Sequence, residues 1–344
     1  MQSAQLVSRE RIEVRAMPEP PEPGPDEVTV RVRALGLCGT DLHFYLEGAS
    51  AGRAVSYPCV LGHEAAGAVV AAGKNVQAIA AGTRVAVEPT ITCGECEFCL
   101  AGRRNLCEHA VFMGGLQQPG LLRELATMPA RNVVTIPDGM SYAAATLIEP
   151  LAVILHAFEL TPVEPGQTVA VMGAGPIGLL SAAVARLSGA GRVVVADRIA
   201  HRLNLALEMG ADTVVDISRE LVADAILDIT GGRGAHLIVD AAGRPDSLTQ
   251  ALWALAPGGR IALIGIPSES SMSVDIQAAL TREATLVVVR RSNQNDYAAL
   301  GLIASGKIRA EMLVTHRFAL DQTDHAFQVL AGYADGVAKA VVEL

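Results

Sequence analysis

The strongest constraint on the fold is a glycine turn that lies between a short uncharged segment and a helical one. The chain reads Gly173-Ala-Gly175-Pro176-Ile177-Gly178 directly after residues 168–172. In such a turn the first glycine permits the bend, the second lets the backbone approach a pyrophosphate, and the third lets the helix pack against the strand. The helix N-terminus then presents free N–H groups to the anion. The turn therefore predicts a dinucleotide-binding βαβ unit; the alternative is a glycine turn that serves packing alone.

An acidic residue after the next apolar segment supports cofactor binding. Residues 192–197 end in Asp197, roughly 20 residues beyond the turn, where a carboxylate binds the ribose hydroxyls. That carboxylate would repel the 2′-phosphate of NADP by up to about 4 kcal/mol near a protein surface. NAD is therefore favoured. NADP remains the alternative, because Arg198 follows directly and can pair with a phosphate.

The pattern of apolar and polar residues changes near residue 151. After this point, strand-length apolar runs at 168–173, 192–197, 213–216, 237–240, 260–266 and 285–290 are separated by helical stretches at 176–187, 200–209, 219–230 and 247–255. This alternation is typical of a parallel, doubly wound α/β sheet. The earlier residues instead contain short alternating segments, such as 28–34, 65–72 and 83–87, and predict a β-rich domain.

Length and charge exclude several classes of protein. A chain of 344 residues suits two domains. A net charge of −9, without a basic run, argues against a nucleic-acid partner. The uncharged stretch 168–185 contains three glycines of the turn and Pro176, so a strand, a turn and a buried helix explain it better than a membrane span. The first 14 residues lack an apolar core of signal-peptide length.

Four of the six cysteines crowd into one short segment. Cys93, Cys96, Cys99 and Cys107 can close a tetrahedral zinc site within the lobe 93–107. Four thiolates leave no open coordination position, so this zinc would be structural. An iron–sulfur cluster uses similar ligands but has no evident role beside a nicotinamide fold. Such crowding favours metal binding over disulfides, and we expect a reducing cytoplasm.

A second set of metal ligands stands apart from the lobe. Cys38, His63 and Glu64 can hold zinc and leave a position for water or substrate. Glu149 lies in the apolar stretch 147–151, where a buried carboxylate needs a partner such as zinc or a zinc-bound water. Taken singly, these residues fit a core cysteine, a core histidine, a surface charge and a hinge ion pair. Their joint occurrence beside a cofactor domain favours the metal.

Together these segments resemble the zinc-containing medium-chain dehydrogenases, most closely the sorbitol (polyol) dehydrogenase branch. The resemblance covers essentially the whole chain and is carried by residues 38–43, 61–67, 93–107, 148–153, 173–178 and 313–318. It implies a GroES-like catalytic domain over residues 1–152, a Rossmann domain over 153–290, and a return to the catalytic domain over 291–344. The active site would lie between the two domains.

The resemblance also implies roles for single residues. Cys38 and His63 would ligate the catalytic zinc, with Glu64 completing the set and Glu149 as a near or exchanging ligand. The alcohol dehydrogenase branch has a cysteine near position 149; its absence here favours the polyol or threonine type. Thr40 and His43 would form a proton relay, and Asp41 would orient His63. Arg202 and Arg290 would contact the cofactor, although segment 290–293 matches the family only in part.

The expected function is oxidation of a polyol or another secondary alcohol by NAD, with two zinc ions per chain. By resemblance, the protein would be a homotetramer or a dimer. The nearest alternative is L-threonine 3-dehydrogenase, followed by a sugar-acid or inositol-type dehydrogenase. A protein that only binds nucleotide, or a zinc-stapled interaction module, is disfavoured by the joint presence of Cys38, Thr40, His43, His63 and Glu64.

Overall fold

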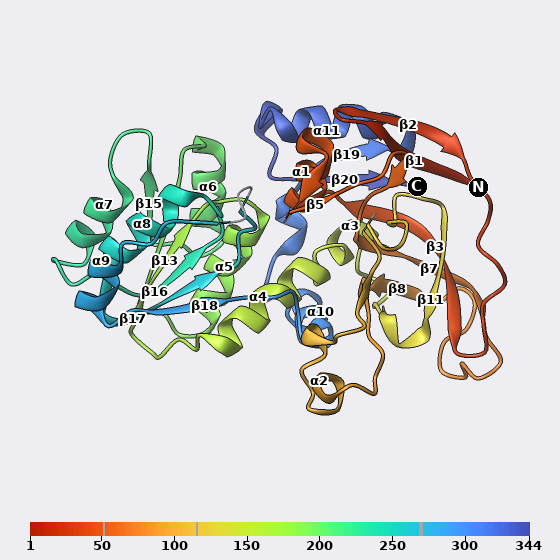
Figure 1. The fold of residues 1–344 in the computed structure, drawn as a ribbon, viewed down its shortest axis with the longest axis horizontal. Coiled ribbons are helices and arrows are strands. Elements are labelled where there is room, and N and C mark those ends of the chain that lie inside the picture. The colour runs from red at the N-terminus through yellow and green to blue at the C-terminus, as the bar shows by residue number, and fades with distance from the viewer. Residues whose placement is uncertain (51, 115, 268–270) are drawn as a thin grey trace. The chain divides into compact units, whose positions relative to one another are not determined.

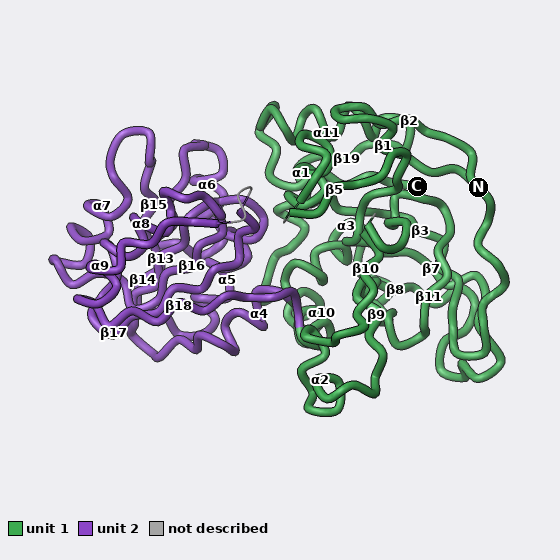
Figure 2. Tube along the Cα trace, in the orientation of Figure 1, with its two compact units in different colours: residues 1–152, 293–344 green, residues 153–292 purple. Residues whose placement is uncertain are grey.

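The computed structural model describes residues 1–50, 52–114, 116–267 and 271–344 (Figure 1). The chain forms two compact units, coloured separately in Figure 2. Unit 1 comprises Met1–Ala152 and Asn293–Leu344, and unit 2 comprises Val153–Ser292. The first boundary coincides with the one expected from the sequence, and the second lies two residues later than the expected 290. Unit 1 is therefore built from two separate pieces of the chain.

Unit 2 is a six-stranded parallel sheet in the order β15-β14-β13-β16-β17-β18. Helix α5 packs with α6, and α8 packs with α7 and α9. This confirms the expected doubly wound α/β sheet. Its strands are β13 (Thr168–Met172), β14 (Arg192–Asp197), β15 (Thr213–Asp216), β16 (Ala235–Asp240), β17 (Leu255–Leu263) and β18 (Thr285–Val288); its helices are α5 (Pro176–Leu187), α6 (Ala200–Glu208), α7 (Val222–Ile229), α8 (Pro245–Ala254) and α9 (Ile276–Arg282).

Several boundaries in unit 2 differ from the sequence prediction by up to three residues, and the start of β17 differs most. Strand β17 begins at Leu255, whereas the sequence predicted a helix to 255 and a strand only from 260. Helix α8 ends because Leu255 is already extended, with φ −74° and ψ 136°. Pro257 follows two residues later and cannot continue a helix, and it disfavours helical backbone at the residue before it.

Unit 1 is built on a seven-stranded sheet in the order β12-β8-β7-β3-β20-β19, with β11 also paired to β3. Strand β20, from the end of the chain, lies antiparallel to β3, and β3 lies antiparallel to β7. Gly36 is opposite both Val341 and Glu64 in these pairings. The sheet thus brings together three segments that are far apart in the sequence. Its strands are β3 (Glu27–Gly36), β7 (Glu64–Ala72), β8 (Arg84–Val87), β11 (Leu125–Pro129), β12 (Val133–Thr135), β19 (Val314–Ala319) and β20 (Lys339–Glu343).

Shorter elements complete unit 1. Its small sheets are β1 (Gln2–Ser8) with β2 (Arg11–Ala16) and β6 (Cys59–Val60), β4 (Ala49–Ser50) with β5 (Arg53–Ala54), and β9 (Thr90–Ile91) with β10 (Val111–Phe112). Its helices are α1 (Gly39–Glu47), α2 (Glu97–Leu100), α3 (Tyr142–Ala145), α10 (Asp296–Ala304) and α11 (Thr323–Ala331), and α4 (Ile148–Leu160) contains the boundary between the units. Single 3-10 turns are Arg104–Leu106, Ala130–Asn132, Ala310–Leu313, Leu320–Gln322 and Ala334–Gly336.

One stretch of the described residues, Tyr142–Leu160, is long and apolar enough to cross a membrane by length and composition. In the fold, 78% of its most apolar window is buried inside the protein, as in a core helix. The stretch considered from the sequence, residues 168–185, forms β13, the glycine turn and most of α5.

The close packing of α5 on β13 yields a stability prediction. A Cβ atom on Gly178 would lie 1.7 Å from the carbonyl oxygen of Gly173. Gly178→Ala must therefore push the helix from the strand, and we expect a loss of about 1–3 kcal/mol in the free energy of unfolding. Thermal or denaturant unfolding measures this change.

Gly175→Ala is the matched control, because the nearest atom to its added Cβ is Arg202 Nη1 at 4.0 Å. Equal stability of Gly178→Ala and the wild type would contradict the packing role of this glycine.

Candidate active site

Cys38, His63 and Glu64 converge in unit 1. One ligand atom from each lies within 4.8 Å of the others. His63 and Glu64 are buried, with exposed fractions of 4% and 2%. Cys38 is the N-cap residue of α1 just after β3, and Glu64 opens β7. Because β3 and β7 are neighbours, their pairing brings the thiol, the imidazole and the carboxylate together.

The carboxylate of Asp41 holds both ligand segments. Its Oδ2 accepts the backbone N–H of Cys38 at 3.1 Å, and its Oδ1 accepts the backbone N–H of Gly62 at 3.1 Å. Oδ1 also lies 3.5 Å from Nδ1 of His63, and this nitrogen has no hydrogen-bond partner among the described residues. Burial opposes the charged imidazolium, but the Asp41 and Cys38 charges prevail and raise the pKa of His63 well above its usual range. A ring nitrogen facing a buried carboxylate is typical of a metal-bound histidine.

Lys339 is a buried partner of Glu64 that the sequence analysis missed. Its Nζ pairs with Oε2 of Glu64, and its exposed fraction is 1%. Burial opposes the charged lysine, but Glu64 and Cys38 outweigh burial and raise the pKa of Lys339. Gly36 makes room for the pair, since a Cβ there would lie 2.6 Å from Oε2 of Glu64. The signal was a single lysine in the apolar run 337–342, because lysine is rarely buried unless paired.

Three further carboxyl groups lie in the electrostatic surroundings of this set. Burial is the main cause that raises the pKa of Glu149 to about 7, with Glu64 and Glu88 adding and His63 opposing. Burial likewise raises the pKa of Asp296, at the start of α10, to about 8, with Glu88 and Glu149 adding. Glu149 is not part of the converging group, but its charge is coupled to it. A bound cation would favour the ionised form of these carboxyls.

Thr40 and His43 lie on α1 beside this set. Thr40 Oγ1 is 3.8 Å from the Cys38 sulfur. His43 follows three residues later, on the same helix face, and its Nδ1 is 3.0 Å from Glu47 Oε1. The His43 side chain is 28% exposed. The two residues therefore lead from the half-buried Cys38 toward solvent.

An aromatic ring that the sequence analysis did not single out packs on His63. The Phe112 ring lies with its centroid 5.2 Å from that of the imidazole, tilted by 51°. Phe112 belongs to the short strand β10. Its ring gives the converging polar groups an apolar neighbour.

The four lobe cysteines also converge, with one sulfur from each within 4.8 Å of the others. The backbone N–H groups of Cys93 and Cys96 donate to the sulfurs of Cys107 and Cys93, both at 3.4 Å. Hydrogen bonds from the backbone N–H groups of Cys99 and Glu108 lower the pKa of Cys96 to about 6. All described cysteines are free thiols. Thiolate-stabilising amides around four close sulfurs fit a tetrahedral metal site.

The glycine turn and Asp197 lie together in unit 2. Gly173 has φ +97°, a conformation that favours glycine. Asp197 Oδ2 accepts the N–H of Ala174 in the turn at 2.6 Å, and Oδ1 accepts the N–H of Ile199 at 2.9 Å. Pro176 and Ile177 open α5, and the buried Arg202 lies close to Gly175. The carboxylate is thereby positioned at the turn by the backbone itself.

Two predicted arginines stand further out. Arg198 is exposed directly after β14. Arg290 is exposed two residues past the end of β18. Strand β18 lies three positions from β13 in the sheet, which is roughly 14 Å at the usual strand spacing. Within unit 2, the structure therefore does not bring Arg290 to the glycine turn.

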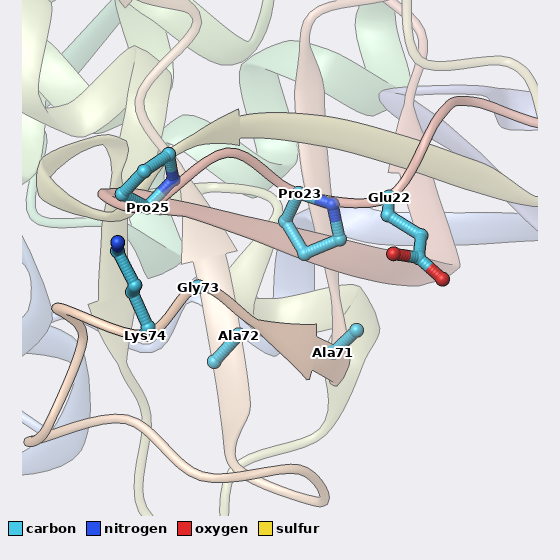
Figure 3. A pocket seen from close by; sticks show the side chains of 7 residues that line it. All are labelled: Glu22, Pro23, Pro25, Ala71, Ala72, Gly73 and Lys74. Carbon is cyan, nitrogen blue, oxygen red and sulfur yellow. The ribbon is translucent and has the colours of Figure 1, made fainter.

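A surface hollow of about 410 Å³ lies elsewhere on unit 1 and is lined by Glu22, Pro23, Pro25, Ala71, Ala72, Gly73 and Lys74 (Figure 3). It borders the end of β7 that is opposite to Glu64, about 23 Å along the strand at 3.3 Å per residue. None of the predicted site residues lines it.

Comparison with known proteins gives the family. The model of the alcohol dehydrogenase GroES-like domain matches residues 24–138, and that of the zinc-binding dehydrogenase matches residues 176–305. Sorbitol dehydrogenase of Bacillus subtilis (strain 168) is 35% identical over 342 residues, which cover 99% of this chain and 97% of that protein. The chain belongs to the zinc-dependent medium-chain dehydrogenases, in the branch that resembles sorbitol dehydrogenase.

Other members of this dehydrogenase family are nearly as similar. L-threonine 3-dehydrogenase of Bacillus licheniformis is 34% identical over 307 residues, 88% of each chain. A solved structure described as a zinc-binding dehydrogenase of Sinorhizobium meliloti 1021, bound to NADP, is 32% identical with a TM-score of 0.90, and covers 100% of this chain and 99% of that one. The thiol, imidazole and carboxylate donors described above fit the zinc of this family, and the glycine turn fits its dinucleotide.

The buried Glu64–Lys339 pair predicts a metal-dependent stability effect in this dehydrogenase. Lys339→Met leaves the buried Glu64 carboxylate without its cation, which costs about 3–5 kcal/mol in the metal-free protein. Bound zinc replaces the missing charge, so we expect a smaller loss in the zinc-loaded protein. Denaturant unfolding of both forms measures the two losses.

The control is Lys307→Met, which changes an exposed lysine of unit 1 and should leave both forms unaffected. Equal losses in the metal-free and zinc-loaded forms of Lys339→Met would show that the lysine and the metal do not share Glu64.

Proposed function

We propose that the protein oxidises a secondary hydroxyl of a polyol to a ketone and passes the hydride to NAD. The observation that carries this proposal is the convergence of the half-buried Cys38 with the buried His63 and Glu64. A thiolate, an imidazole and a carboxylate suit a zinc ion that keeps a position open for substrate. The polyol is supported by the similarity to sorbitol dehydrogenase over nearly the whole chain.

Two zinc ions per chain would serve different ends. When bound, the catalytic zinc lowers the pKa of the substrate hydroxyl toward neutrality, so that hydride can pass to the nicotinamide. Cys38, His63 and Glu64 would hold this ion. Glu149 is proposed as the exchanging ligand, because Lys339 competes for Glu64 and the buried Glu149 carboxyl interacts electrostatically with both His63 and Glu64. The lobe cysteines Cys93, Cys96, Cys99 and Cys107 would hold the structural ion.

The residues of α1 would carry the proton released from the substrate. Thr40 stands beside Cys38 and can take the substrate hydroxyl proton as it gives up its own toward the nicotinamide ribose, and His43, one turn further along α1, can pass a proton from there to solvent. Asp41 would act by orienting His63 and anchoring Cys38.

The cofactor would bind at the turn formed by Gly173, Gly175, Pro176, Ile177 and Gly178. Asp197 would accept the adenosine ribose hydroxyls, because a carboxylate has about four lone-pair sites and, within the described part of the chain, two of them accept backbone N–H groups. Arg202 and Arg198 would contact the ribose or a phosphate, and Arg290 the nicotinamide half. We favour NAD because Asp197 repels a 2′-phosphate, although a similar structure binds NADP.

We further propose a homotetramer, with a dimer as the smaller alternative, in the cytoplasm. Strand β18 is the last strand of its sheet, and Val288 on it is 75% exposed. Leu280 and Ile276 of the neighbouring α9 are 69% and 66% exposed. An apolar edge of this kind suits pairing with a second copy. Light scattering would measure the assembly, and cell fractionation the location.

The second candidate is L-threonine 3-dehydrogenase. It rests on a relative almost as similar as sorbitol dehydrogenase and on the shared opening Cys38-Gly-Thr-Asp41. Both functions use the same zinc group, and only the substrate differs.

A substrate screen tests the proposed function. The zinc-loaded protein is assayed for NAD reduction with sorbitol, xylitol, L-threonine and simple secondary alcohols. We expect kcat/KM for the best polyol to exceed that for L-threonine by about tenfold or more, a difference of about 1.4 kcal/mol in transition-state binding. A preference for L-threonine would establish the second candidate instead.

His63→Ala is the control for the metal. With added zinc it should retain NADH binding but lose turnover, and wild-type-like turnover would rule out the zinc-dependent mechanism.

The cofactor preference depends on Asp197. Asp197→Gly removes the charge that opposes a 2′-phosphate, and we expect the ratio of kcat/KM for NADP to that for NAD to rise by about tenfold or more. Glu220→Gln, at an exposed residue two positions before α7, serves as the charge-matched control. An unchanged ratio would mean that Asp197 does not distinguish the ribose of NAD from the phosphorylated ribose of NADP.

A further inference from the structure

We infer that Asp240 is a positioning residue that shapes the nicotinamide half of the cofactor site. The inference rests on the proposed dinucleotide binding. Asp240 is the last residue of β16 and is 1% exposed. Asp240 belongs to none of the sequence motifs of the family resemblance. Its carboxylate accepts hydrogen bonds from a loop that lies directly beside the glycine turn.

The carboxylate of Asp240 ties down the loop that follows β16. Its Oδ1 accepts the N–H groups of Ala242 and Gly243, both at 3.0 Å. The Ser247 hydroxyl, near the start of α8, donates to Oδ2 at 2.7 Å. Charge-assisted hydrogen bonds of this kind are roughly twice as strong as neutral ones. One buried side chain therefore sets the backbone of the loop and the entry into the next helix.

The loop is also fastened to the strands on both sides. The N–H of Ala241 donates to the carbonyl of Met172, at the end of β13, at 2.9 Å. The N–H groups of Ile264 and Gly265, after β17, donate to the Asp240 carbonyl at 3.0 and 2.9 Å. The three strand ends β13, β16 and β17 are thus joined around Asp240.

Glycines allow this loop to lie against its neighbours. A Cβ on Gly173 would lie 3.2 Å from the backbone nitrogen of Ala242, so the loop touches the first glycine of the turn. A Cβ on Gly265 would lie 2.4 Å from the nitrogen of Gly243, which itself has φ +63°. The loop therefore lies between the glycine turn and the segment that follows β17.

The strand order indicates which half of the cofactor crosses this loop. The chain runs outward from β13 through β14 to β15 and then resumes at β16 on the other side of β13. Ligands of such sheets bind at the carboxyl ends of the strands, at this switch point. With the pyrophosphate at the turn after β13 and the adenosine ribose at Asp197 after β14, the nicotinamide half must extend over β16. Asp240 therefore positions backbone for that half alone.

The experiment compares two ligands of the full-length protein. NADH reaches both halves of the site, whereas ADP reaches only the turn and Asp197. Asp240→Ala frees the loop, and we expect the Kd of NADH to rise by about tenfold and the Kd of ADP to stay within about twofold. Asp240→Asn should restore NADH binding, because its Oδ1 still accepts both loop N–H groups and its Nδ2 can donate to Ser247.

Asp246→Ala is the matched control, since this exposed aspartate lies on the adjoining helix α8. Should Asp240→Ala fail to fold, Ser247→Ala loosens the same carboxylate, and we expect it to weaken NADH binding about threefold without affecting ADP. Equal weakening of NADH and ADP, or no weakening of NADH, would overturn the inference. Because the measurement needs no alcohol, a protein that binds NADH but oxidises no polyol would refute the proposed substrate and leave the role of Asp240 standing.

Discussion

The buried carboxylate of Asp41 holds two distant stretches of the chain at one place. It accepts a hydrogen bond from the backbone beside each ligand segment, at Cys38 and at Gly62, and it faces the ring of His63. A buried carboxylate without such donors would be strongly disfavoured. Its burial is therefore compatible with folding only when the turn after β3 and the start of β7 are both in place. The geometry of the thiol and imidazole donors depends on that condition.

Charge balance is the second requirement of the same site. Cys38, Glu64 and Asp41 are acidic groups in a buried region, and Lys339 is the cation that the described structure sets against Glu64. Removing one partner of a buried pair is far more destabilising than exchanging the whole pair for apolar groups. The lysine thus balances the negative charge of the carboxylate, and the metal-binding group can fold around its own acidic groups.

The edge of the unit 2 sheet that would bind the cofactor is organised by other carboxylates. There the acidic residues Asp197 and Asp240 cap backbone N–H groups at the ends of two strands on either side of β13. Both stiffen loops that must lie close to a bound dinucleotide. Rigid backbone at a binding site reduces the ordering cost of association. Each unit therefore prepares its own part of the chemistry by the same means, a buried or half-buried carboxylate hydrogen-bonded to loop amides.

The sequence by itself determined the elements whose signal is local. The glycine turn, the doubly wound alternation, the four-cysteine lobe and the pair His63-Glu64 depend on spacing within a few residues, and steric and ligand-geometry rules act over that range. Only the tertiary structure decided which distant side chains meet. Lys339 reaches Glu64 across 275 positions of the chain because β20 lies beside β3, and Asp240 gained its role from the strands on either side of it. The local pattern around such residues looks like ordinary strand sequence, since the register that gives them partners is set by sheet pairing and not by near neighbours.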